Sequence, residues 1–350
     1  MKKPTTIHDI ARAANVSSAT VSRVLSNSGY PVSKPMREKI LRVAAELNYI
    51  PNLIGKQLKK NTSNTIGVIV PTIVNPFYAS VVFGIEEIAR QNSFTVMACN
   101  TLQDPALEEE YIRTVLEKQV KGLIISSISS DKTLLKQAIG LGLHVIAIDQ
   151  NIEEDGISQI DFDYRKGACL AVKYLLEKGH SRIGYVTSKL DRPSRKLIYQ
   201  GYLESMREAG LEPLVAEAKA EEGYSAVYEF DTGRKLAQQL LENNSPPTAI
   251  FACNDLMAFG VIQELSRRGV DVPGQISVMG FDGIEVGQMI HPPLTTIKQP
   301  DYEMGKMACK MLIDRMNGEE SHQFDVILQP KLIERSSVAA REAARSHKVR

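Results

Sequence analysis

From Thr65 onward, short apolar runs typical of β-strands alternate with longer amphipathic segments typical of α-helices. The predicted strands are Ile66–Val70, Thr95–Cys99, Gly122–Ser126, His144–Ile148, Ile183–Val186, Ala249–Ala252 and Ile276–Gly280. The predicted helices include Phe77–Gln91, Pro105–Lys118, Arg165–Lys178, Ser194–Ala209, Asp231–Glu242 and Asp255–Arg268. Apolar strands alternating with helices are typical of parallel sheets with both faces covered. Because the strands are too many for one compact sheet, and the pattern begins again after Ile148, we predict two similar doubly wound α/β lobes.

Polar side chains follow several of these strands, at the edge where parallel strands end. Ligands of doubly wound folds bind at that edge, and carboxylates, amides and aromatic faces suit a polyol. Each such residue alone is better explained as a helix cap, since Asp and Asn are common where a strand leads into a helix. As a set on one rim, they predict a ligand pocket between the lobes. The predicted effector-binding residues are Asn75, Phe77, Asp149, Ser194, Tyr224, Asn254, Asp282 and Gln299.

Residues 6–25 predict two short helices joined by a sharp turn. Thr6 and Asp9 have the spacing of a capping box at the start of the first helix. Ser17 or Ser18 is placed to cap the second helix, whose outward face carries small and hydroxylic residues and one cation. That face suits a helix that enters the major groove of DNA. An ordinary helical hairpin is the alternative.

The distribution of charge favours the DNA-binding alternative. Residues 1–60 hold eleven Lys or Arg residues and three acidic ones, a net charge of +8, whereas the remainder carries −7. A basic head on an acidic body is the electrostatic pattern expected for contact with phosphates. A solvated basic face alone does not explain why the charge coincides with the helix-turn-helix pattern.

A third helix is predicted at about 34–47, with Pro35 in its first turn. Its predicted buried residues are Ile40, Leu41, Val43, Ala44 and Leu47. The following segment, 51–61, has a helix-starting proline, but it is too short to be stable alone. We predict a linker that becomes helical only when it is bound.

Composition excludes several classes of protein. The four cysteines are scattered without a Cys-x-x-Cys pair and the six histidines are dispersed, so we expect no disulfide and no metal. An N-terminal apolar region and a run of ~18 apolar residues are both absent, so we expect no secretory signal, no membrane span and a cytoplasmic protein.

Catalysis is not expected either. The only Gly-x-Gly, at 140–142, precedes a strand and lacks the third glycine of a dinucleotide site, so we expect no cofactor. No Ser/His/Asp set or pair of glutamates points to an enzyme. A plain sugar-binding protein is a further alternative, but it does not explain the basic head.

In order and spacing, the motifs of this chain resemble those of the lac-repressor/galactose-repressor (LacI/GalR) family. The matching segments are 6–25, Leu-Asn-Tyr-Ile-Pro-Asn at 47–52, 66–77, Gly-His-Ser-Arg-Ile at 179–183, 252–258, Gly-Phe-Asp at 280–282 and 292–300. The resemblance implies a lambda-repressor-like three-helix head and a periplasmic-binding-protein-like body. The implied ranges are 1–50 for the helix-turn-helix head, 51–61 for a hinge helix, 62–161 with 292–322 for the N-terminal lobe, 162–291 with 323–337 for the C-terminal lobe, and 338–350 for a disordered tail.

The resemblance also implies roles for residues that would contact DNA. The implied base contacts are Ser18, Ala19 and Arg23, of which Arg23 is the candidate for a bidentate guanine contact. The hydroxyls of Thr6, Ser17, Thr20 and Ser22 are candidates for phosphate contacts. The implied minor-groove residues of the hinge are Leu58, as the inserting wedge, flanked by Asn52, Lys56 and Lys59.

Three positions depart from the family pattern. Gly55 stands where alanine is usual, which makes the hinge more dependent on DNA and on a dimer partner. Ile198 replaces a cleft arginine, and Gln150 stands where related sugar sensors often carry arginine. We consider Arg195 or Lys196 as substitutes for the missing cation.

The family resemblance implies a repressor of a carbohydrate-use operon, released from a palindromic operator by a sugar-like effector. Since the C-terminus has no leucine heptads, we expect a homodimer rather than a tetramer. Two alternatives remain, namely control by a phosphorylated carrier protein and control by a corepressor ligand.

Overall fold

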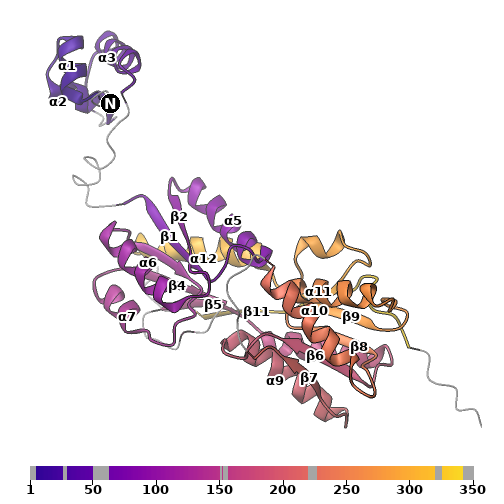
Figure 1. The fold of residues 1–350 in the computed structure, drawn as a ribbon. Coiled ribbons are helices and arrows are strands. Elements are labelled where there is room, and N and C mark those ends of the chain that lie inside the picture. Colours follow the sequence, from indigo (N-terminus) through magenta and orange to yellow (C-terminus); the bar gives the residue numbers. More distant parts are fainter. Residues whose placement is uncertain are drawn as a thin grey trace, which may run out of the picture. The chain divides into compact units, whose positions relative to one another are not determined.

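The computed structural model describes residues 5–26, 30–49, 63–149, 152, 157–219, 227–319 and 325–341. The chain divides into two compact units, a head (Met1–Thr62) and a body (Ser63–Arg350). The two units have separate hydrophobic cores, and Figure 1 shows the elements of each.

The head contains the predicted three helices, α1 (Ile7–Ala14), α2 (Ser18–Leu25) and α3 (Lys34–Glu46). The capping box is confirmed, because the Thr6 hydroxyl accepts from the Asp9 backbone and the Asp9 carboxylate accepts from the Thr6 backbone. Asn15 ends α1 in the left-handed conformation (φ 55°), which Asn tolerates better than most residues. The turn between the two helices therefore forms as predicted.

One prediction about the head core is wrong. Ile40, Val43 and Ala44 are buried, but the side chains of Leu41 and Leu47 are 47% and 36% exposed. Leu41 lies about 100° around the helix from Ile40, which turns it away from the stripe that faces α1 and α2. Leu47 follows the last residue of α3, where the stripe ends.

The first lobe of the body is a six-stranded parallel sheet in the order β11-β5-β4-β3-β1-β2. Its strands are β1 (Thr65–Val70), β2 (Thr95–Asn100), β3 (Gly122–Ile125), β4 (His144–Ile148), β5 (Ser158–Phe162) and β11 (Asp325–Leu328). Its helices are α5 (Pro76–Gln91), α6 (Pro105–Glu117), α7 (Thr133–Gly140) and α12 (Asp301–Met316). Ile66, Val68 and Val70 of β1 pack with α5, whereas Ile69 packs with α6. Both faces of this sheet are therefore buried, as the apolar runs predict.

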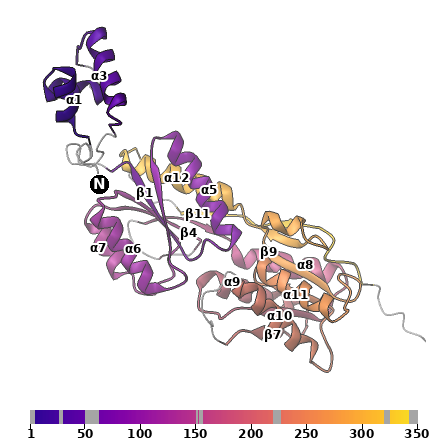
Figure 2. The same cartoon turned by 45° about the horizontal axis from the view of Figure 1, so that its top comes forward.

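The second lobe repeats this arrangement in the order β12-β10-β9-β8-β6-β7, with only β12 antiparallel. Its strands are β6 (Ile183–Thr187), β7 (Leu214–Glu217), β8 (Ala249–Ala252), β9 (Ser277–Asp282), β10 (Thr295–Lys298) and β12 (Lys331–Ile333). Its helices are α8 (Tyr164–Glu177), α9 (Pro193–Glu208), α10 (Tyr228–Leu241), α11 (Asp255–Arg267) and a 3-10 turn, η1 (Glu285–Gln288). Helices α10 and α11 lie side by side (Figure 2). The two doubly wound lobes are confirmed.

The predicted lobe boundaries need correction. The chain crosses between the lobes after β5, after β10 and after β11. The resemblance implies that 292–322 belongs to the first lobe and 323–337 to the second. Strand β10 instead lies in the second sheet, and β11 lies in the first. Short strands at or near a sheet edge have the same sequence pattern in either lobe, so periodicity does not assign them.

The tail prediction for 338–350 is wrong for its first four residues. Val338 is buried, the Ala339 backbone N–H donates to Ser277 Oγ at 3.1 Å, and the Arg341 N–H donates to the Lys178 carbonyl at 2.8 Å. Backbone pairing of Ser337 with Val278 carries this segment along the second lobe. Residues 342–350 lie outside the described part.

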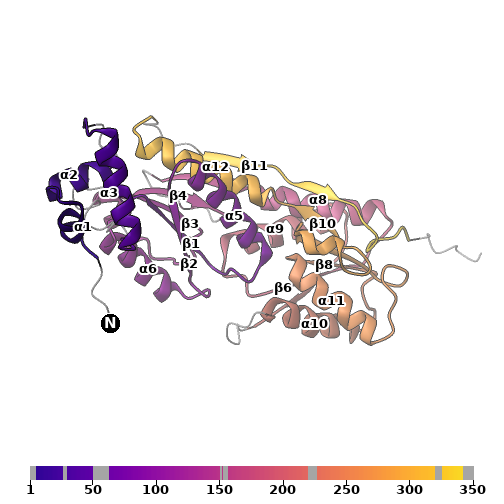
Figure 3. The same cartoon turned by 90° about the horizontal axis from the view of Figure 1, so that it is seen from above.

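Helices α5 and α12 lie along each other (Figure 3), and a pair of glycines sets their distance. A Cβ on Gly84 would lie 2.2 Å from the Tyr302 carbonyl oxygen, and one on Gly305 would lie 2.0 Å from the Val81 carbonyl oxygen. Because both neighbours are backbone atoms, a side chain at either position would force the helices apart. The glycines thus permit the close approach that covers one face of the first sheet.

None of the described helices combines the length and apolar character that crossing a lipid bilayer requires. Within the same residues, no three His, Cys, Asp or Glu side chains are grouped so that they could hold a metal ion.

Candidate functional site

The first candidate site is the outward face of α2 in the head. Ser17 caps α2, its hydroxyl accepting from the Thr20 backbone at 3.1 Å and lying 2.8 Å from the Thr20 hydroxyl. Ala19 and Arg23 are exposed, while Ser18, Thr20 and Ser22 are half-buried. The predicted base-contacting side chains, Ser18, Ala19 and Arg23, therefore come from one short helix beside a turn, the arrangement that a major groove accepts.

Two of these side chains already have partners within the head. Ser18 Oγ lies 3.0 Å from His8 Nδ1 on α1, and the Arg23 guanidinium lies over the ring of Tyr30, 3.9 Å from its centroid. Thr6, predicted to contact phosphate, donates from its hydroxyl to Asp9 Oδ2 at 2.7 Å. Contacts of these residues with DNA stay predictions. The hinge residues Asn52, Lys56, Leu58 and Lys59 lie outside the described residues, as does Gly55.

The second candidate site is a cleft at the carboxyl ends of the strands of both lobes. It encloses about 480 Å³ of space unoccupied by protein atoms, part of which is open solvent. Its lining residues are Thr72, Asn75, Phe77, Tyr78, Asp149, Tyr164, Arg192, Ser194, Arg195, Ile198, Glu229, Cys253, Asn254, Asp282 and Gln299. Seven predicted effector-binding residues are thus brought together, and Tyr224 lies outside the described part.

Asp149, at the end of β4, is covered by hydroxyl groups. Its Oδ2 accepts from the Tyr78 hydroxyl at 2.6 Å and from Ser126 Oγ at 3.1 Å, and its Oδ1 accepts from the Tyr164 hydroxyl. Burial, reinforced by the charge of Asp149, raises the pKa of both tyrosines well above 10.0, so both keep their protons. Tyr78, Tyr164 and Asp149 all line the cleft, and a phenol oxygen that donates its proton can still accept a hydrogen bond.

Asp282 lies across the cleft at the end of β9. Its Oδ1 accepts from Gln299 Nε2 at 2.8 Å, and its Oδ2 accepts from Asn75 Nδ2 of the first lobe at 3.5 Å. Burial raises the pKa of Asp282 well above 3.8, and nearby Asp255 raises it further. Its carboxyl group therefore connects the lobes and favours the protonated form.

Asp255, the first residue of α11, lies behind Asp282. It is buried, and accepts from Thr296 Oγ1 at 2.6 Å and from the Ile284 backbone N–H at 2.8 Å. Burial raises the pKa of Asp255 from 3.8 to about 7, despite these hydrogen bonds, which act in the opposite direction. Asp255 is absent from the cleft lining, but it raises the pKa of Asp282, which lines the cleft.

Two arginine side chains line the cleft, Arg195 from α9 and Arg192 from the residue just before that helix. Arg195 is 5% exposed, with Nη2 3.4 Å from Glu229 Oε1 and Nη1 3.5 Å from Asp191 Oδ1. Arg195 therefore reaches the cleft wall beside Ile198, whereas Lys196 is exposed and absent from the lining. Whether Arg195 replaces the missing arginine in binding a ligand stays a prediction, and Gln150 is not among the described residues.

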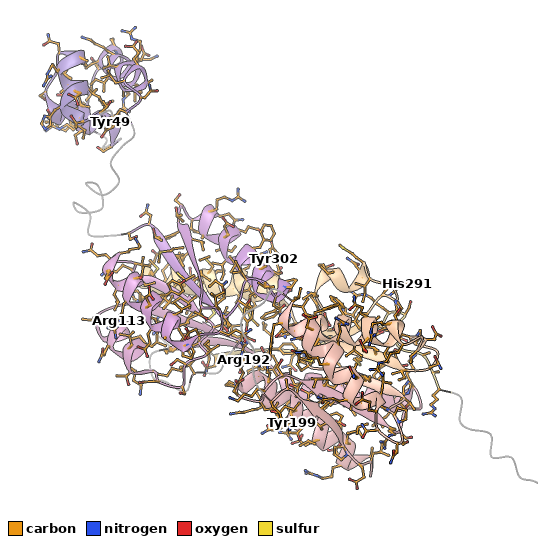
Figure 4. The ribbon with its side chains drawn as sticks, viewed as in Figure 1. Tyr49, Arg113, Arg192, Tyr199, His291 and Tyr302 are labelled. Carbon is orange, nitrogen blue, oxygen red and sulfur yellow. The ribbon has the colours of Figure 1, made fainter. Side chains whose placement is uncertain are left out.

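Arg192 connects the two walls. It lies where the lobes meet (Figure 4), and its Nη2 donates to Gln103 Oε1 on the loop after β2. Leu102 and Gln103 both have positive φ, 51° and 63°, which is uncommon for residues other than glycine. We call this Arg192–Gln103 contact the clasp.

Sequence reasoning missed Arg192, Tyr78, Tyr164 and Glu229. Arg192 follows β6 at the same sheet edge as the predicted residues, so the rule that found those would have found it. Tyr78 directly follows Phe77. Tyr164 and Glu229 lie at the starts of helices α8 and α10, where the sequence carries no mark of their proximity to the cleft.

Comparisons with known proteins find matches for both units of the chain. Residues 6–52 match the family model of bacterial regulatory proteins, lacI family, and residues 172–338 match the periplasmic binding protein-like domain. The HTH-type transcriptional repressor CytR of Escherichia coli K12 is 35% identical over 337 residues, or 96% of each chain.

Solved structures are similar over the same regions. The lac repressor dimer bound to operator and the anti-inducer ONPF aligns with a TM-score of 0.81 and 28% identity, over 97% of this chain and 100% of that one. A LacI family transcriptional regulator from Enterococcus faecium with bound ribose aligns with a TM-score of 0.71 and 28% identity, over 79% and 100%.

Proposed function

The chain belongs to the LacI family of bacterial regulatory proteins, and from this premise we propose that it represses a carbohydrate-use operon and is released from DNA by a hydroxyl-rich, sugar-like effector bound in the cleft. It is a DNA-binding transcriptional regulator and not an enzyme. The head supplies the operator contacts, with Arg23 as the guanine-contacting residue. The protein acts as a homodimer on a palindromic site, in the cytoplasm, where its DNA target is.

The chemistry of the cleft supports an effector rich in hydrogen-bond donors. Gln299 Oε1 is a buried acceptor without a hydrogen-bond partner. The phenol oxygens of Tyr78 and Tyr164 offer further acceptor capacity, and Phe77 offers an aromatic face. Since a buried acceptor left unpaired is costly, a ligand hydroxyl placed at Gln299 would gain affinity. This unpartnered acceptor is the observation that carries the proposal, and the relative solved with bound ribose supports it.

A thermal-shift screen of the whole protein tests the effector. The panel holds monosaccharides, disaccharides, phosphorylated sugars, nucleosides and free nucleobases. A ligand at about 100 times its dissociation constant adds about 2.7 kcal/mol of stability, enough to raise the melting temperature clearly. We expect a hit among compounds with several hydroxyls.

Two variants connect a hit to the cleft. Gln299→Leu removes the acceptor at similar size, together with the amide that donates to Asp282, and we expect it to weaken effector binding by roughly 5- to 150-fold. Arg113→Ala, exposed on α6 away from Arg192 (Figure 4), is the matched control and should bind like the parent protein. Equal affinities in both variants would show that the ligand binds elsewhere.

A screen without hits would favour control by a phosphorylated carrier protein, which calorimetry with such a protein measures directly. An effector that tightens operator binding instead of weakening it would identify a corepressor.

A further inference from the structure

The aromatic residue beside the recognition helix has no structural role in the head core. The Tyr30 side chain is 53% exposed, and it is absent from the apolar side chains that pack between α1, α2 and α3. One face of its ring instead carries the guanidinium of Arg23, at 3.9 Å from the ring centroid. This contact joins the last turn of α2 to the segment that enters α3.

The backbone at Tyr30 is held by its neighbours. Pro31 follows it, and the residue before a proline is restricted to extended conformations. Val32 packs against the head core and so anchors the same segment from the other side. The ring is therefore presented from a constrained backbone rather than from a freely rotating one.

A stacked guanidinium keeps its hydrogen-bonding capacity. The five N–H donors of arginine lie in the plane of the group, so a ring against its face does not itself occupy them. A bidentate contact with the O6 and N7 atoms of guanine uses two such in-plane donors. Stacking on Tyr30 is thus compatible with guanine recognition, and it restricts a side chain that otherwise loses much rotamer freedom on binding.

We propose that Tyr30 is a positioning residue for base recognition, which holds the Arg23 guanidinium stacked so that its donor edge meets a guanine of the operator. This inference rests on the proposed function, because it requires that Arg23 contacts a base. It assigns Tyr30 to sequence discrimination and not to general affinity for DNA. Removal of the ring therefore lowers the ratio of operator to non-specific affinity.

The experiment uses the full-length protein and an operator obtained by selection from a pool of randomised palindromic duplexes. Fluorescence anisotropy then gives the affinity for this operator and for a non-specific duplex of equal length, at one fixed salt concentration. Tyr30→Leu, which keeps an apolar side chain without the π-face, should lower the operator preference about two- to tenfold, because the Arg23 side chain must then be ordered when it binds the base. Tyr30→Phe should retain it, and Arg23→Ala should lose about 5- to 150-fold.

A modified base tests whether Tyr30 orients Arg23 toward a guanine or only supports the fold of the head. Replacing single guanines by 7-deazaguanine removes the N7 acceptor, and at the contacted position it should weaken binding by the parent protein. In Tyr30→Leu the same replacement should cost less, and in Arg23→Ala it should cost nothing. Because Tyr30 is exposed and outside the core, thermal melting of the variants should match that of the parent.

Three results would overturn the inference. An operator preference of Tyr30→Leu equal to that of the parent would exclude a positioning role, and equal losses on both duplexes would assign Tyr30 to backbone contact instead. A full 7-deazaguanine effect in Tyr30→Leu would show that Arg23 is oriented without the ring. If selection yields no operator at all, the proposed function is wrong, and the inference about Tyr30 is wrong as a consequence. That result can be distinguished from the three results above.

Discussion

At the scale of single residues, the two aspartates that line the cleft, Asp149 and Asp282, have unusual backbones. Asp149 has a φ of 66°, which Asp tolerates, but Asp282 has a φ of 111°, outside the regions that side chains favour. Such strain persists only where surrounding contacts hold it, and Asp282 is held by Gln299 and Asn75. Strain at the residue that joins the lobes is consistent with a functional position.

The first prediction concerns Asp255. Its pKa in the folded protein, about 7, is above its ordinary 3.8, so the folded state holds the proton more tightly than the unfolded one. The stability from this group is fully present below pH 3.8 and is lost as the pH rises through about 7. Asp255→Asn does not titrate at this position. As the pH rises from acid to mildly alkaline, its free energy of unfolding should therefore increase by about 1–4 kcal/mol relative to that of the parent. Denaturant unfolding across this range measures it, and parallel curves for both proteins would contradict it.

The residue scale also shows what sequence could and could not provide. Asp149, Asp282 and Gln299 were predicted because position after a strand is visible in the sequence. That two tyrosines cover Asp149 depends on the placement of α5 and α8, which no local pattern records. The exposure of Leu41 was not predicted either. A leucine next to a buried position of a helix cannot be told from a buried leucine by residue type alone.

At the scale of elements, helix pairs depend on glycines where backbones touch. Gly305→Ala should separate α12 from α5, because the added Cβ would meet the Val81 carbonyl at 2.0 Å. We expect a loss of about 1–3 kcal/mol in the free energy of unfolding. Gly140→Ala, at the end of α7, is the control: its Cβ would meet nothing within 4 Å, so the change should be neutral or stabilising. Urea titration decides, and similar losses in both would refute the packing argument.

The clasp between Arg192 and Gln103 gives a second prediction at this scale. If a ligand and Gln103 compete for Arg192, shortening the partner with Gln103→Asn should tighten effector binding about two- to tenfold. Asn also tolerates the positive φ at this position. Gln103→Glu should have the opposite effect, because a carboxylate holds the guanidinium more strongly. Calorimetric titration compares the three proteins, and an unchanged affinity in both variants would exclude the competition.

Elements near the sheet edges were the hardest to predict. The central strands are continuous apolar runs, and their existence and parallel arrangement follow from the sequence. Strands β5, β7, β11 and β12 are short and only partly apolar, and they were not predicted. Assignment of β10 and β11 to a sheet depends on which lobe the chain has crossed into, and this is a property of the tertiary fold.

At the scale of the whole molecule, head and body are separate compact units with separate cores. Scanning calorimetry without DNA should therefore resolve two unfolding transitions, a small one from the head and a larger one from the body. An effector at 100 times its dissociation constant should stabilise the body by about 2.7 kcal/mol. The melting temperature of the body transition should therefore rise, and that of the head transition should stay unchanged. Operator DNA should raise the head transition. A single transition that both ligands move equally would show that the two units unfold together.

The three crossings between the lobes affect how this chain is completed during synthesis. Each lobe is assembled from separate stretches of the sequence, and α12 and β11 reach the first sheet only after most of the second lobe has been made. Until residue 316 has left the ribosome, the face of β3 and β4 that α12 covers has no partner, although the small head can already fold. Chains that terminate early would thus expose an apolar sheet face, which makes them aggregation-prone and good substrates for chaperones and proteases. Both lobes become complete almost together, once β11 and β12 have been made.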